Sequence, residues 1–384
     1  MLPDTTLQVP ASLMTLLTAF APLFTAPSFR TFTMLACGFL AQPGRRTVCG
    51  MLSGAGLARL WPHDRAHWFF SRARWNPDDL GLAAAKLVVA LLVPAGEPVL
   101  VAIDDTLFRR GRKVWAASWF HDGSAQGKHK TGRGNNWVVL AIVVSLPFCT
   151  RPFALPVMAK LVVKGTSSAS RLWLARRMTS SLADALPGRD LHAVADSAYA
   201  GEELKKLGKN VTWTTRLRKD AALHGLPPER TGKRGRPRVR GARLPKLAGL
   251  AAATAFTQVT VTRYGKTETV QAAAITCLWY TVFGTRPVQV ILVRDKSASG
   301  YDLARAGHAP TRAPIGPWFR PWARLAPIVA TMPTARLHLA RGGTGWCRRL
   351  ASSTTMDAAQ ISPSTVNGSR RAVRPVSPWD VTNS

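Results

Sequence analysis

The first part of the chain carries hydrophobic residues at helical spacing. Apolar side chains recur at intervals of three and four residues through Leu13–Phe24 and Phe29–Leu40, which is the period of an amphipathic helix. Pro27 separates the two stretches, as expected where one helix ends and another begins. The pattern predicts a helical region over residues 1–85.

From residue 99 the pattern changes to short apolar runs. Val99–Ile103, Trp137–Val144 and Leu191–Ala195 are continuous runs of the kind found in buried strands, and Ala169–Ala185 between them has helical periodicity. Further expected elements are a strand at Lys113–Phe120, a polar turn region at Asp122–Asn136 and a helix at Glu202–Leu207. This alternation predicts an α/β fold, in which ligands bind at the carboxyl ends of the strands.

Two later segments depart from that alternation. Residues 218–272 contain a basic stretch from Arg230 to Lys246, followed by two alternating segments, Phe256–Arg263 and Thr269–Ile275, that predict paired strands. We interpret this block as a β-rich insertion, after which Val288–Val293 returns as a core strand. Residues 303–384 hold eleven Arg, no Lys and no Glu, with weak periodicity, so an irregular tail is expected there.

The charge of the chain narrows the class of partner. The 384 residues include 52 Lys and Arg against 20 Asp and Glu, which gives a formal net charge of +32. Such a surface suits a protein that neutralises phosphates, and a merely basic or ribosome-associated protein is the alternative. The five cysteines are widely spaced, so we expect reduced thiols, a cytoplasmic protein and no metal bound through cysteine. No apolar run is long enough to predict a membrane span.

Two aspartates end apolar runs at positions that suit metal chemistry. Asp104 follows Val99–Ile103, and Asp196 follows Leu191–Ala195. Carboxylates that meet at the ends of neighbouring strands can hold two Mg²⁺ ions, which activate a water and stabilise a leaving oxygen. The other interpretation is structural: Asp196 can cap the following turn, and Asp105 can form an Asx turn.

These aspartates belong to an ordered set of motifs that resembles a known family. The set, which covers about residues 25–302, resembles the DDE transposases of bacterial insertion sequences. Its members are Asp104–Thr106, Gly111–Val114, His121–Asp122, Asn135–Val138, Leu146–Phe148, Leu155–Pro156, Ala195–Ala200, Arg216–Asp220 and Lys233–Pro237.

The resemblance implies a fold and an activity. The fold would be an RNase H-like mixed sheet with flanking helices, a β-rich insertion, a helical N-terminal region and an irregular C-terminal tail. Together with the patterns above, it divides the chain into 1–85, a helical DNA-binding region; 86–217, the first part of the core; 218–272, the basic, β-rich insertion; 273–302, the last core strand; and 303–384, the atypical Arg/Pro-rich tail. The activity would be cleavage and strand transfer at the terminal inverted repeats of a mobile element, dependent on Mg²⁺ or Mn²⁺. A homodimer would act on element and target DNA in the bacterial nucleoid.

Position by position, the resemblance assigns Asp104 and Asp196 as catalytic metal ligands, with Asp105 as a less favoured third ligand. The family's catalytic Glu lies on a helix after the last core strand, but no Glu follows Glu268 in this sequence. The third acid is therefore unknown, and Asp357 is a poor substitute in its polar surroundings. We hypothesise that a frameshift near 303–306 replaced the helix, which leaves this copy impaired or a non-catalytic DNA-binding remnant.

Basic residues mark the expected DNA-binding surface. Arg234 and Arg236 belong to an Arg-Gly-Arg-Pro sequence, which suits a narrow minor groove or a phosphate backbone. Thr47 is expected to cap a helix that follows a basic pair. This helix could lie across the DNA backbone, and the alternative is that it is only structural. Trp115, Trp119 and Trp137 are expected mostly in the core, with one able to stack on an unpaired base. The full set of expected DNA contacts is Arg45, Arg46, Lys128, Lys130, Arg133, Lys233, Arg234, Arg236 and Arg238.

Overall fold

The structure is a computed structural model. It describes residues 9–44, 47–122, 125, 130–149, 151–218, 220–229, 234–263, 266–294 and 303–307. Arg45, Arg46, Lys128, Lys233 and the tail beyond residue 307 lie outside the described residues, so the predictions made for them stay predictions.

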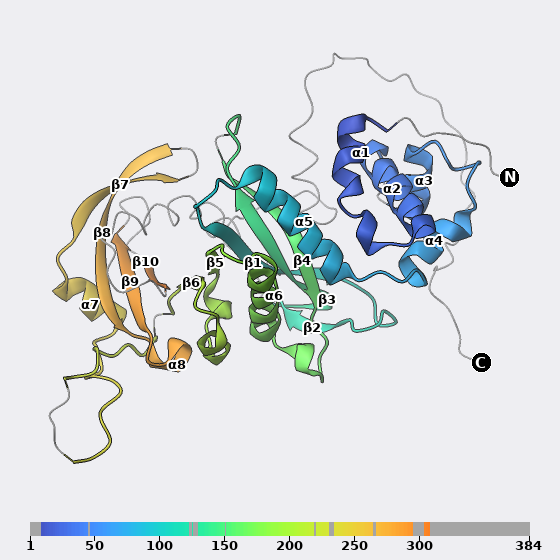
Figure 1. Ribbon diagram of the computed structural model, residues 1–384. Coiled ribbons are helices and arrows are strands. Elements are labelled where there is room, and N and C mark those ends of the chain that lie inside the picture. Colours follow the sequence, from blue (N-terminus) through green and yellow to red (C-terminus); the bar gives the residue numbers. More distant parts are fainter. Residues whose placement is uncertain are drawn as a thin grey trace, which may run out of the picture. The chain divides into compact units, whose positions relative to one another are not determined.

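The N-terminal region is helical, as the periodicity predicts (Figure 1). It consists of α1 (Ala11–Thr18), η1 (Ala21–Leu23), α2 (Ala26–Ala41), α3 (Val48–Gly54) and α4 (His63–Ser71). These helices have a hydrophobic cluster of their own, which includes Leu35, Leu52 and Phe69. Thr47 is the N-cap of α3, as predicted, because its Oγ1 accepts a hydrogen bond of 3.0 Å from the backbone N–H of Gly50.

The next helix, α5 (Pro77–Leu92), belongs to the α/β core rather than to the N-terminal helices. Asn76 caps it by accepting a hydrogen bond from the N–H of Asp78, and Pro77 occupies the first turn. Ala85 and Val89 are buried in the cluster that fills the core of the sheet. The expected boundary at residue 85 therefore falls inside this helix, because its periodic apolar face packs on the sheet.

One mixed sheet forms the rest of the fold. In the described residues its strand order is β2-β3-β1-β5-β6-β10-β9-β8-β7, with β4 paired to β3. β1 and β5 are parallel, as are β5 and β6, and the other pairs are antiparallel. The strands are β1 (Val99–Arg109), β2 (Ser118–His121), β3 (Thr131–Val144), β4 (Phe153–Leu161), β5 (Leu191–Ala195), β6 (Val211–Arg216), β7 (Thr257–Arg263), β8 (Lys266–Leu278), β9 (Pro287–Arg294) and β10 (Leu303–Gly307). The predicted mixed α/β sheet with flanking helices is confirmed.

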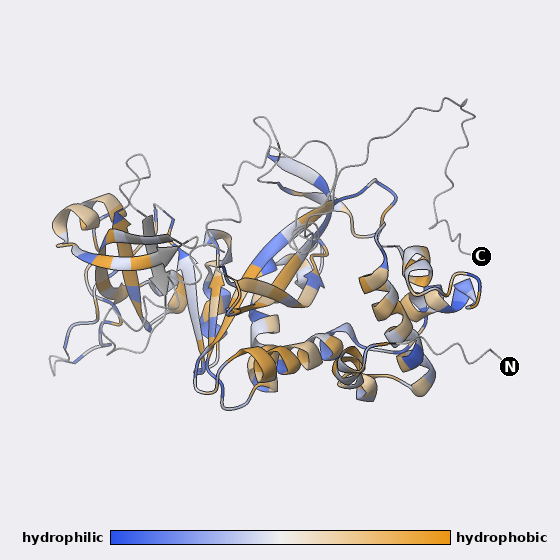
Figure 2. Cartoon of the chain, turned by 90° about the horizontal axis from the view of Figure 1, so that it is seen from above, coloured by the Kyte–Doolittle hydropathy of each residue, from blue (hydrophilic) through white to orange (hydrophobic). Residues whose placement is uncertain are grey.

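Helices α5 and α6 (Arg171–Ala185) cover one face of β1, β3 and β4 (Figure 1). Alternate residues of the strands point to this face, so that Val101, Ile103 and Leu140 are buried against the helices. Hydrophobic residues, orange in Figure 2, are concentrated along the strands and along a neighbouring helix. Short helical turns complete the fold: η2 (Ser167–Ala169), η3 (Ser197–Tyr199), η4 (Glu202–Lys206), α7 (Leu247–Ala253) and α8 (Tyr280–Phe283).

Several predicted elements differ in extent. The strand expected at Lys113–Phe120 is confined to Ser118–His121, and the predicted helix at Glu202–Leu207 is the 3₁₀ helix η4. The polar region Asp122–Asn136 is not all turn, because Thr131–Asn136 is the first part of β3. That part pairs with β2 on one side and β1 on the other, so backbone hydrogen bonds hold it extended although its side chains are polar.

The predicted β-rich insertion is continuous with the core sheet. β7 and β8 pair with each other, and β8 also pairs with β9, so the expected boundary at residue 272 falls inside β8. The segment 303–384 was expected to be mostly irregular, and its first residues form β10 between β6 and β9. The edges of β6 and β9 both offer backbone hydrogen-bonding groups to this segment, which explains why it is extended although it has little hydrophobic pattern. Among the described residues, no helix has both the length and the apolar character needed to cross a bilayer.

A buried histidine on β5 makes the stability of the fold depend on pH. His192 lies between Thr212 and Thr214, whose hydroxyl oxygens are 2.7 Å and 3.2 Å from its ring nitrogens. Burial lowers the pKa of His192 to about 4. In the unfolded chain His192 binds a proton below about pH 6.5, whereas in the folded chain its ring stays neutral down to about pH 4. The neutral histidine therefore lowers the stability of the fold only below about pH 6.5, and above that pH the unfolding free energy is unaffected by it. We expect His192 to remove about 3 kcal/mol of unfolding free energy as the pH falls from about 6.5 to about 4.

The measurement is denaturant unfolding of the wild type and of His192→Asn across this pH range. Other groups also titrate, so the difference between the two proteins isolates the histidine. The expected result is that the difference in unfolding free energy between wild type and variant shrinks as the solution becomes more acidic. A difference that stays constant from neutral pH to pH 4 would contradict the assignment.

Candidate active site

The pairing of β1 and β5 places the two predicted aspartates side by side. The strands are parallel, with Ile103 opposite Ala195, and Asp104 and Asp196 are the next residue on each. Neighbouring strands lie about 4.8 Å apart. The structure thus brings together two carboxylates that are separated by 92 residues in the chain.

Both aspartates share one face of the sheet. Side chains alternate along a strand, so Asp104 lies on the side of Ala102, and Asp196, whose backbone is also extended, lies on the side of Val194. Ala102 and Val194 pack together with Val143 in a small cluster apart from the main core. This face is opposite the one that α6 covers at Ile103. The expected meeting of the two carboxylates thus agrees with the strand geometry.

Asp105 points to the opposite face, where three side chains bind it. Nη1 of Arg171 donates to both of its carboxylate oxygens, at 3.0 Å and 2.9 Å. Nδ2 of Asn136 donates to Oδ2 at 2.8 Å, and the hydroxyl of Tyr199 donates to Oδ1 at 3.0 Å. These bonds join α6, β3 and η3 to the middle of β1. They give Asp105 a positioning role, since they fix the strand that carries Asp104.

Asp105 is not in a turn, as one interpretation of the sequence had it. β1 continues beyond it to Arg109, because Asp105 pairs with Val138 and Arg109 with Gly134 on β3. Asp104 therefore lies within a strand rather than at its end. It is β5, the parallel neighbour, that ends beside it.

Asp196 has a structural role in addition to its position beside Asp104. Its Oδ1 accepts a hydrogen bond of 2.8 Å from the N–H of Ala198, and Asp196 is the N-cap of η3. The hydroxyl of Thr215, on the neighbouring strand β6, donates to the backbone carbonyl of Asp196 at 2.6 Å. The capping interpretation is therefore confirmed, and together with the β6 contact the cap fixes the backbone at Asp196.

The site concentrates negative charge in a half-buried position. The pKa of Asp104 is raised to about 7, mainly by burial and to a smaller extent by the carboxylates of Asp105 and Asp196, while a backbone hydrogen bond and Arg171 act in the opposite sense. Burial also raises the pKa of Asp196. Clustered carboxylates of this kind repel one another and gain from a cation placed between them. Their hard oxygen donors fit Mg²⁺ or Mn²⁺.

Arg171 and Asn136 were not predicted as parts of the site. Arg171 is the first residue of α6, where the positive end of the helix dipole disfavours a cation. An arginine at that position was the available signal, because it indicates an acidic partner nearby. Tyr199 lies within the Ala195–Ala200 motif, and its hydroxyl is hydrogen-bonded and buried, with its pKa raised by burial and then by Asp105.

The other predicted residues lie away from the carboxylates. Arg234, Arg236 and Arg238 are exposed on the long connection between β6 and α7, and Lys130 is exposed before β3. The side chain of Arg133, on β3, donates to the backbone carbonyl of Arg112.

Two tryptophans expected in the core are on the surface. The exposed fractions of Trp115 and Trp119 are 75% and 58%, and Trp137 is partly buried. Trp119 is exposed because side chains alternate along β2, so that its neighbour Phe120 packs against the main core while Trp119 points to the other face. The neighbouring motif residue Asp122 is buried and forms a 2.9 Å salt bridge with Arg109, whereas His121 is exposed at the end of β2.

The chain is similar to one protein family over most of its length and, more distantly, to a solved structure. A family profile described as "DDE superfamily endonuclease" matches residues 19–281. No curated protein matches the sequence. Among solved structures, the chain is similar to a piggyBac transposase in a synaptic complex with hairpin DNA, with 10% identity and a TM-score of 0.31. The match covers 82% of this chain and 54% of that one.

Proposed function

Because the chain belongs to the DDE superfamily of endonucleases, we propose that it is the transposase of an insertion sequence, acting on DNA through Asp104 and Asp196. The observation that carries the proposal is the position of these two aspartates on one face of adjacent parallel strands. The formal net charge of +32 supports a polyanionic substrate.

The residues of the site divide into ligands and positioning groups. Asp104 and Asp196 would hold divalent ions, which in such sites activate a water or hydroxyl and stabilise the leaving oxygen. Asp105, bound by Arg171, keeps β1 in a fixed register beneath Asp104. The hydroxyl of Thr215 fixes the backbone of Asp196 by donating a hydrogen bond to its carbonyl oxygen. Preorganised carboxylates of this kind avoid a reorganisation cost when substrate binds.

The third acid is the weak point of the proposed site. No Glu follows Glu268 in the sequence, and the described part of the core ends with β10 at Gly307. The proposed frameshift at 303–306 falls within this strand. Losing one metal-holding carboxylate costs on the order of a thousandfold in rate, so we propose that this copy cleaves DNA slowly or not at all. The alternative is a remnant that binds element ends without cutting, which the missing Glu favours.

The exposed arginines between β6 and α7 are the proposed DNA contacts that can be tested directly. We expect the full chain to bind labelled duplex DNA with an association constant that falls as the salt concentration rises. A plot of the logarithm of that constant against the logarithm of the salt concentration should have a slope of about −0.9 for each phosphate contact. Arg234→Ala, Arg236→Ala and Arg238→Ala should each reduce that slope by about one. Arg177→Ala, an exposed arginine on α6 that stacks on Trp173, is the matched control and should leave the slope unchanged.

The same DNA separates the transposase from the remnant. Duplexes that carry the sequences flanking the gene are incubated with the chain and with Mg²⁺ or Mn²⁺. Cleavage that disappears in Asp104→Ala supports the enzyme, whereas binding without cleavage supports the remnant. Binding that does not respond to salt would overturn both, and cleavage that survives Asp104→Ala would overturn the assignment of the site.

A further inference from the structure

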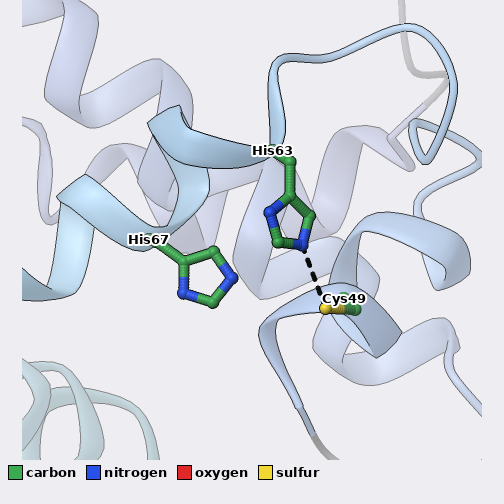
Figure 3. Close-up of side chains that lie close together, drawn as sticks. All are labelled: Cys49, His63 and His67. Carbon is green, nitrogen blue, oxygen red and sulfur yellow. Dashed lines mark hydrogen bonds between the residues drawn. The ribbon is translucent and has the colours of Figure 1, made fainter. Parts of the chain in front are cut away.

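Three metal-binding side chains gather in the N-terminal helices, away from the carboxylates of the sheet. His63 and His67 are one turn apart on α4, and Cys49 lies on α3 (Figure 3). The Sγ of Cys49 is 3.1 Å from Nε2 of His63, and the two imidazole ring centroids are 4.5 Å apart. One donor atom from each of the three residues lies within 4.8 Å of the other two. All three residues are exposed and therefore accessible to an ion.

This donor set matches the preferences of Zn²⁺. Zinc binds thiolate sulfur at about 2.3 Å and imidazole nitrogen at about 2.0–2.1 Å, in tetrahedral geometry. Ligand atoms around it are therefore separated by about 3.5 Å, which is close to the Cys49–His63 distance. A His pair spaced by four residues on a helix presents both rings on one side, as in other zinc sites. Thiolate and imidazole are softer donors than carboxylates, so Mg²⁺ is disfavoured here.

We propose that Cys49, His63 and His67 form a Zn²⁺ site that joins α3 to α4. The wide spacing of the cysteines predicted no metal bound through cysteine, and the proximity of Cys49 to the two histidines revises that prediction. Three protein ligands leave the fourth position of the ion to water. An ion bound by both helices stabilises their packing, since the chain binds it only when the helices are folded together. The proposal does not depend on the chemistry proposed for Asp104 and Asp196.

The experiment is metal titration of the full chain purified with chelator. We expect one Zn²⁺ per chain, measured by competition with a chromogenic zinc indicator. Zinc should raise the melting temperature by several degrees, and a chelator should reverse the rise. Co²⁺ in place of zinc should give the charge-transfer absorption of a cobalt–thiolate bond.

Variants identify the ligands. Cys49→Ser should abolish the cobalt–thiolate band and weaken zinc binding by at least about 100-fold, and His67→Gln should weaken zinc binding while keeping the band. Cys149→Ser, which removes a free and partly buried cysteine outside the cluster, should bind zinc as the wild type does. Circular dichroism checks that each variant is folded, and if Cys49→Ser is not, His67→Gln decides. If the wild-type chain binds no zinc, or if the variants bind it with wild-type affinity, the proposal is wrong and the cluster is only a thiol–imidazole hydrogen bond.

Discussion

A chain whose reading frame is restored after codon 302 is expected to cleave DNA at least about a thousandfold faster than the chain described here. The gain comes from a third carboxylate on a helix after the last core strand, which would complete the metal site begun by Asp104 and Asp196. The gene is first read in the other two frames downstream of codon 302. The frame that encodes a Glu-bearing helix is then expressed and assayed on the flanking DNA with Mg²⁺.

The control for this experiment is Asp104→Asn in the restored chain. The variant keeps the shape of the side chain and removes its charge, so the cleavage rate should return to the level of the unrestored chain. Binding of the same DNA should change little, because the proposed arginine contacts are intact. The frameshift hypothesis fails if neither alternative frame encodes such a helix, or if the restored chain cuts no faster.

Replacing Arg171 by alanine is expected to destabilise the protein by about 2 to 3 kcal/mol. Arg171 is the cationic partner of Asp105, whose side chain is 16% exposed, and its removal leaves that carboxylate poorly compensated. Loss of a partner from a fully buried pair costs about 3–5 kcal/mol, and the Arg171 side chain, 35% exposed, is partly screened by water, which lowers the figure. Urea unfolding at neutral pH measures the loss.

Two variants on the same helix test the cause. Arg171→Lys keeps the charge but not the guanidinium geometry that contacts both carboxylate oxygens, so its loss should be intermediate. Arg177→Ala removes an exposed arginine that stacks on Trp173 and should cost about 1 kcal/mol or less. Equal losses in Arg171→Ala and Arg177→Ala would show that Asp105 does not need its partner.

The elements that were predicted well are those whose local sequence and tertiary pairing agree. Leu191–Ala195 was predicted with the bounds that β5 has, because a strand buried on both faces is apolar along almost its whole length, His192 being the exception here. The approach of Asp104 and Asp196 followed from two such runs. By contrast, β1 extends through Asp104 and Asp105 because β3 pairs with it. The polar residues at 104–106 give no local sign of that pairing.

The residues that were missed depend on contacts between distant segments. Arg171 meets Asp105 across 66 positions, and only the packing of α6 on β1 and β3 brings them together. Cys49 and His63 are 14 residues apart, a spacing outside the short motifs by which zinc sites are recognised in a sequence. Their proximity arises from the way α3 packs on α4. β10 was missed because its position is set by two neighbouring strands rather than by its own side chains.

The place of β10 in the sheet constrains the order in which the protein can assemble on the ribosome. β10 is the last described strand in the chain, yet it lies between β6 and β9 and joins β1–β6 to the β7–β9 meander. Among the described strands no other pairing links those two halves, so they have no backbone ladder between them until Gly307 leaves the exit tunnel. Closure therefore comes late in synthesis, and it relies on main-chain groups that any residue except proline supplies in full. The frameshift proposed within this strand would therefore leave the sheet complete, although it would replace the expected catalytic helix downstream.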